Sequence, residues 1–144
     1  MNDTEFKKKA ALIGEKRTAR DSEEAAEKQR EQDLTSRRAD ESRRLRERVI
    51  GPALVDAARM LNENGVRAQA HPYDPDCGSA FITLLEIMGT PELHFERTTR
   101  GDLISVYERR SSQGVGGRID VPFEKITREF VLERVLKFAE ARGG

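Results

Sequence analysis

The first 48 residues of this chain are half charged, and this feature limits most strongly what the chain can fold into. They contain 14 Lys or Arg and 12 Asp or Glu, and their large apolar residues after Met1 are Phe6, Leu12, Ile13, Leu34 and Leu45. A segment with so little apolar surface cannot build a core, because burial of apolar surface is what offsets the entropy lost on folding. We therefore expect residues 1–48 to form a charged extension and residues 49–144 to form the globular domain.

The composition of the extension predicts a helix. It has no proline and one glycine, and it is rich in Ala, Glu, Arg, Lys and Gln, which lose little side-chain freedom in a helix. Charges of alternating sign recur at steps of three and four from Arg30 to Glu47, which adds weak support. Ala19 and Ala26 follow Leu12 at seven-residue steps, but the later large residues break this register, so a long coiled coil is not indicated. We expect a solvated helix, frayed or disordered before about residue 20, with pairing to a second copy or another partner as an alternative.

Arginines gather at the end of this extension. The predicted contacts for a partner are Arg37, Arg38, Arg44, Leu45 and Arg48. Cations along a helix also suit phosphates, so nucleic-acid binding is a third and weaker hypothesis. Carboxylates alternate with these arginines, and residues 7–72 contain no Phe, Tyr or Trp side chain to stack on a base, which disfavours nucleic acid.

The remaining 96 residues predict an α+β fold. Gly51-Pro52 interrupts the first helix near Ile50, and a second helix begins at Pro52 and ends at Gly65. Alternating patterns predict strands over residues 66–71, 93–97, 103–109 and 118–123, with Pro122 indicating an edge strand. A nearly continuous apolar stretch predicts a central strand over residues 80–88. Thr127 is positioned to cap a last amphipathic helix that reaches Arg142. The predicted architecture is a long polar N-terminal helix, a helix, an antiparallel sheet of about five strands and a C-terminal helix packed on the sheet, with the helices gathered on one face.

Residues that carry chemistry are few. His71, Asp74, Asp76 and Cys77 can all bind metals, but their spacing matches no standard zinc arrangement and suits a turn. Residues 114–117 form a glycine-rich loop that is followed by a strand and not by a helix, so we interpret it as a hairpin loop. We predict no catalytic residue, no metal site and no cofactor. Cys77 is interpreted as a structural thiol.

The leading functional hypothesis is a small cytoplasmic interaction or adaptor protein without catalytic activity that self-associates as a homodimer. The homodimer contacts are expected at the first strand, residues 66–71, and at the N-terminal helix. The alternative is a small-ligand binding protein or minor enzyme with a pocket between sheet and helices, lined by Phe81, Phe95, Tyr107 and Phe123. No run of about 18 apolar residues is present, so no membrane span is predicted. A single cysteine and a short apolar patch at residues 10–13 are the basis for expecting a cytoplasmic location.

Overall fold

The structure is a computed structural model that describes residues 1–74, 78–98, 102–110 and 114–143. It divides into two compact units, residues 1–37 and residues 38–144, each of which is described by itself. No helix in the described part of the chain is both long enough and apolar enough to span a membrane.

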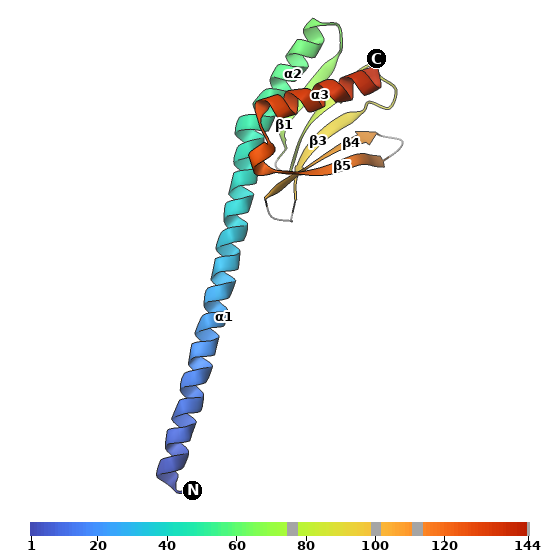
Figure 1. Cartoon of the computed structure of the whole chain (residues 1–144). Coiled ribbons are helices and arrows are strands. Elements are labelled where there is room, and N and C mark those ends of the chain that lie inside the picture. Colours follow the sequence, from blue (N-terminus) through green and yellow to red (C-terminus); the bar gives the residue numbers. More distant parts are fainter. Residues whose placement is uncertain (75–77, 99–101, 111–113, 144) are drawn as a thin grey trace. The chain divides into compact units, whose positions relative to one another are not determined.

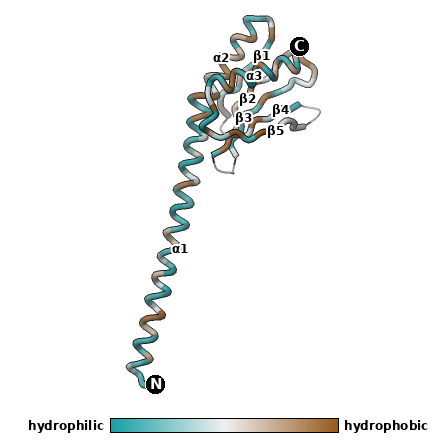
Figure 2. The backbone as a smooth tube through the Cα atoms, viewed as in Figure 1, coloured by the Kyte–Doolittle hydropathy of each residue, from teal (hydrophilic) through white to brown (hydrophobic). Residues whose placement is uncertain are grey.

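The first unit is helical throughout. All regular structure of this unit belongs to helix α1 (Asp3–Leu45). The helix continues beyond the unit, and residues 38–45 of α1 belong to the second unit. The Asn2 side chain accepts a hydrogen bond from the Glu5 backbone N–H at 2.8 Å, which caps the helix. Fraying before residue 20 was therefore the wrong expectation, because the helix begins at Asp3. Figure 2 shows a mainly hydrophilic backbone trace along α1 with isolated apolar positions.

The predicted interruption near Ile50 takes the form of a π-helical turn. This turn covers Arg46–Ile50, and helix α2 (Gly51–Glu63) follows without a break in helical backbone angles. The Gly51 N–H donates to the Arg46 carbonyl, five residues back, which opens the turn where Pro52 would otherwise crowd a carbonyl. Gly65 ends the segment with φ +84°, as its position predicts.

The five strands form an antiparallel meander in chain order (Figure 1). They are β1 (Ala68–Asp74), β2 (Ser79–Leu84), β3 (Glu92–Arg97), β4 (Leu103–Arg110) and β5 (Gly114–Pro122). The predicted edge position of Pro122 is confirmed, because β5 is the last strand of the sheet.

The structure corrects the bounds of several strands. The second strand ends at Leu84 and not at Met88, because Glu86 and Thr90 take positive φ in the turn that follows. The first strand lies at residues 68–74, and the fifth begins at Gly114 inside the segment expected to be a loop. The 3₁₀ turn Phe123–Lys125 removes Phe123 from the last strand.

Helix α3 (Arg128–Gly143) begins as predicted. The Thr127 hydroxyl accepts a hydrogen bond from the Phe130 backbone N–H at 3.1 Å, and the neighbouring Ile126 is buried with Val131. Val131, Val135, Phe138 and Ala139 form the buried face of this helix, whereas Leu136 is exposed.

One face of the sheet forms the core with α2 and α3. The largest fully buried apolar side chains of this single cluster are Ile50, Leu54, Ile82, Leu84, Leu93, Phe95, Ile104, Val106, Val131 and Val135. The strand members of this set share one side of the sheet, because side chains alternate along a strand and the set keeps a two-residue step. No helix among the described residues covers the other face of the sheet (Figure 1). This face carries polar and aromatic side chains.

Candidate interaction surfaces

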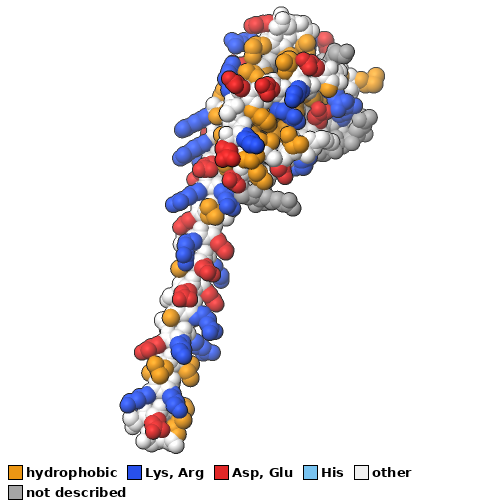
Figure 3. Space-filling view, in the orientation of Figure 1, with side chains coloured by type: hydrophobic (Ala, Val, Ile, Leu, Met, Phe, Trp, Pro, Cys, Tyr) orange, Lys and Arg blue, Asp and Glu red, His pale blue; other side chains and the backbone are white. Residues whose placement is uncertain are grey.

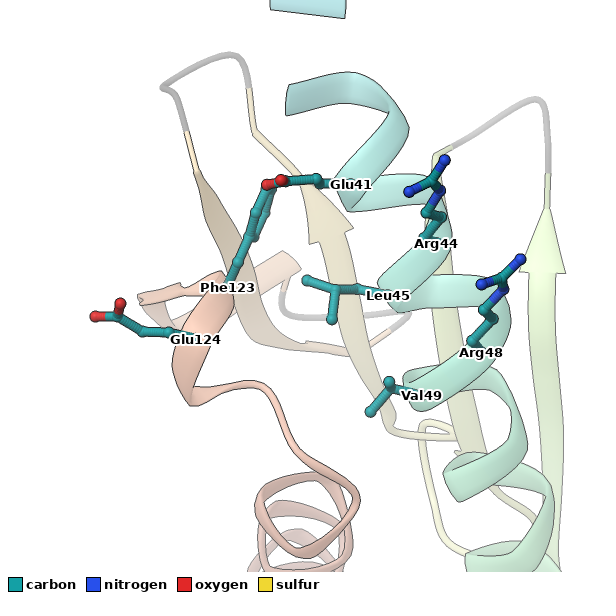
Figure 4. A pocket seen from close by; sticks show the side chains of 7 residues that line it. All are labelled: Glu41, Arg44, Leu45, Arg48, Val49, Phe123 and Glu124. Atoms are coloured by element: carbon teal, nitrogen blue, oxygen red, sulfur yellow. The ribbon is translucent and has the colours of Figure 1, made fainter. Parts of the chain in front are cut away.

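A groove of about 360 Å³ opens on the second unit between the end of α1, the π-helical turn and the 3₁₀ turn. Leu45 and Val49 come from the helical segment and lie one turn apart, so both side chains reach the same side of it. Phe123 faces them from the 3₁₀ turn (Figure 4). These three side chains give the groove an apolar floor.

Charged side chains surround this floor. Arg44 and Arg48 lie one turn apart on the helical side, and Glu124 comes from the 3₁₀ turn (Figure 4). Glu41 completes the lining. None of these four charges takes part in an ion pair within the part of the chain that the structure describes. The groove can therefore accept an aliphatic or aromatic side chain while its rim pairs with charges that flank that side chain.

The structure brings together three of the five predicted partner contacts. Arg44, Leu45 and Arg48 all line the groove. Arg38 is exposed and lies outside the lining, and Arg37 is exposed at the end of the first unit. Val49 also lines the groove and is not among the predicted contacts, although its position four residues after Leu45 is the helical spacing that indicates a shared face.

The four aromatic residues predicted to line one pocket lie in three places. Phe95 is fully buried in the core, on the covered face of the sheet. Phe81 and Tyr107 belong to a stack on the opposite face, and Phe123 lines the groove. Successive side chains of a strand point to opposite faces of the sheet, so Phe95 and the neighbouring His94 lie on different faces, and His94 belongs to the stack.

A ladder of stacked rings crosses the open sheet face. His71, Phe81, His94 and Tyr107 come from four successive strands, with neighbouring ring centroids 4.3, 4.5 and 5.0 Å apart and interplanar angles of 17°, 14° and 5°. The Arg118 guanidinium lies 4.4 Å from the Tyr107 ring centroid and covers its outer side. The inner rings stack on each other, so their faces are not available for bases to stack on.

Hydrogen bonds fix the middle of this ladder. His94 Nδ1 lies 2.8 Å from the Ser79 hydroxyl oxygen, and its Nε2 lies 3.0 Å from a Glu92 carboxylate oxygen. A serine, a histidine and a carboxylate in line are reminiscent of nucleophilic catalysis, but only 2% of Ser79 is exposed. A hydroxyl that substrate cannot reach is not a nucleophile, and we interpret the triplet as a structural network. Burial, reinforced by the Glu96 carboxylate, raises the pKa of the Tyr107 phenol in the same ladder.

The segment from His71 to Cys77, which was considered above as a possible metal site, lies largely outside the described residues. Asp76, Cys77 and the side chain of Asp74 lie outside the part of the chain that the structure describes. Among the residues that the structure does describe, no three His, Cys, Asp or Glu side chains are grouped so as to hold a metal ion.

Helix α1 offers a different kind of surface. Every residue from Met1 to Glu41 is exposed, including Phe6, Leu12, Ile13 and Leu34, which are 64, 56, 62 and 47% exposed. The only ion pair within α1, among the described residues, joins Asp40 and Arg43 at 3.3 Å. The alternating charges from Arg30 to Glu47 therefore do not form the continuous ladder that their spacing suggests. Lys, Arg, Asp and Glu side chains extend from the helix into solvent (Figure 3).

Comparisons with protein-family models, with curated proteins and with solved structures gave no match.

Proposed function

We propose that the protein is a non-catalytic interaction protein that self-associates, with α1 as the principal contact. One observation carries this proposal: α1 has 43 residues, and none before Ser42 is buried. Helices in proteins gain most of their stability by packing an apolar stripe, and every residue from Asp3 to Glu41 is exposed.

The exposed apolar side chains of α1 give such a contact a driving force. Phe6, Leu12, Ile13 and Leu34 each retain about half or more of their surface. Complete burial of a side chain of this size contributes about 1.5–3 kcal/mol. Four such side chains, each counted twice in a two-fold dimer, supply enough apolar surface to support association, although the ordering cost reduces the net gain.

The groove on the second unit supports the same class of function. Its apolar floor at Leu45, Val49 and Phe123 and its unpaired rim charges are features of a protein contact.

The experiment is a measurement of the mass of the full-length chain in solution by sedimentation equilibrium at micromolar concentrations. We expect a concentration-dependent mass that approaches twice 16.3 kDa. The double variant Phe6→Glu, Leu34→Glu should be monomeric, because charges would replace the apolar contacts on α1. Met88→Glu is the matched control, because Met88 is 97% exposed on the second unit and its replacement should leave the dimer intact. A wild-type chain that remains monomeric contradicts the proposal.

A further inference from the structure

The two halves of the α1 segment in the first unit carry opposite charge. Residues 7–20 contain six cations and one carboxylate, whereas residues 21–33 contain six carboxylates and two cations. The cations of the first half are Lys7, Lys8, Lys9, Lys16, Arg17 and Arg20; the carboxylates of the second half are Asp21, Glu23, Glu24, Glu27, Glu31 and Asp33. Within α1, residues 7–20 therefore form a basic block and residues 21–33 form an acidic block.

These charges are available to a partner. All the residues concerned are exposed, and no ion pair joins any two of them within the described chain. One oxygen of the Asp33 carboxylate accepts a hydrogen bond from the Gln29 amide at 3.0 Å.

We infer that two copies of α1 pair antiparallel about a two-fold axis close to Arg20, each basic half lying along the acidic half of the other copy. This inference rests on the proposed self-association and adds the partner's orientation. A parallel arrangement would place the lysines of residues 7–9 against the same lysines of the second copy, and like charges held close together cost binding free energy. The antiparallel arrangement alone makes the charge pattern self-complementary, as a two-fold interface requires.

The charge blocks also select a register. With the axis at Arg20, Lys9 lies opposite Glu31 and Lys16 lies opposite Glu24 of the second copy. The same register places Phe6 opposite Leu34, so an apolar contact forms at each end of the paired segment. Each contact occurs twice because of the two-fold symmetry.

Cross-linking between single cysteines tests the orientation directly. In a full-length background with Cys77→Ser, we expect the Arg20→Cys variant to be cross-linked to itself by a short bismaleimide. Lys9→Cys alone should give little product, and so should Glu31→Cys alone. A mixture of the Lys9→Cys and Glu31→Cys chains should give the mixed dimer. Efficient self-cross-linking of Lys9→Cys would overturn the antiparallel arrangement in favour of a parallel one.

A charge-reversal cycle tests the register without cross-linking. Lys9→Glu and Glu31→Lys should each weaken dimerisation by about fivefold, because each change breaks two exposed ion pairs at once. The combined variant should restore the wild-type dissociation constant. Additive weakening in the combined variant would overturn the pairing of Lys9 with Glu31.

The failure of this inference differs from the failure of the proposed function. A wild-type chain that is dimeric by mass but shows neither the mixed cross-link nor the restored affinity overturns the antiparallel pairing alone. A monomeric mass overturns self-association, and the antiparallel pairing with it.

Discussion

At the scale of single residues, Gly51 occupies a position in the second unit that has no room for a side chain. A Cβ atom there would lie 2.8 Å from the Arg46 carbonyl oxygen and 3.0 Å from the Pro72 carbonyl oxygen. Both neighbours are backbone atoms, so neither can move aside as a flexible side chain would. The glycine is therefore required where the π-helical turn approaches β1, and not for its freedom of φ, since its φ is −56°.

Gly51→Ala should lower the free energy of unfolding of the second unit by about 1–3 kcal/mol, as overpacking of a close contact does. Urea denaturation of the full-length chain measures this change. Gly14→Ala is the control, because a Cβ at Gly14 meets nothing within 4 Å. This second change should increase helix content slightly and leave the urea midpoint of the second unit unaltered. An unchanged midpoint for Gly51→Ala would show that the close approach does not exist in solution.

At the scale of elements, an ion pair joins the two helices that cover the sheet. The Arg128 guanidinium at the start of α3 donates a hydrogen bond to the Asp56 carboxylate of α2, and this bond holds the pKa of the carboxyl below its ordinary value. Because the pKa is lower in the folded state, the stabilisation is present above the unfolded pKa and is lost as pH falls through the folded one.

Asp56→Asn should therefore destabilise the protein at neutral pH, and its difference from wild type should shrink as pH falls below about 4. The measurement is the free energy of unfolding of both chains across this range. In an Arg128→Gln background the same substitution should have a much smaller pH-dependent effect, because the principal cause of the shift is gone. An Asp56→Asn effect that stays constant from pH 6 to pH 3 is incompatible with this contact.

The elements also show what sequence patterns can predict. Alternation located four of the strands, a continuous apolar stretch located β2, and Thr127 located the start of α3, because these signals are local. The strand ends were predicted less accurately. The turn after Leu84 depends on a positive φ at Glu86, and positive φ is uncommon for glutamate, so the sequence does not indicate this turn.

The candidate surfaces were only partly predictable. Arg44, Leu45 and Arg48 could be selected together because they are close in sequence. Phe123 reaches the same groove through tertiary packing, which no local pattern encodes. Likewise, the contact of Ser79 with His94 depends on the pairing of β2 with β3. Because these two residues are 15 positions apart in the sequence, no local pattern indicates their contact.

At the scale of the whole molecule, the two units should differ in how they unfold. No residue of the first unit is buried, and the buried core residues all belong to the second unit. A chain that begins at Arg38 should keep the cooperative thermal transition of the second unit and lose helical circular dichroism signal. Loss of the cooperative transition would mean that the extension contributes to the fold.

The central claim is that a second copy of the chain covers α1, and hydrogen exchange measured at several protein concentrations tests it most directly. The account predicts that protection of the backbone amides of residues 6–34 increases as the concentration is raised through the dissociation constant of the dimer. Protection within the β-sheet of the second unit should not change over the same range, because its burial does not depend on the dimer. Exchange in residues 6–34 that is equally fast at every concentration would contradict the account.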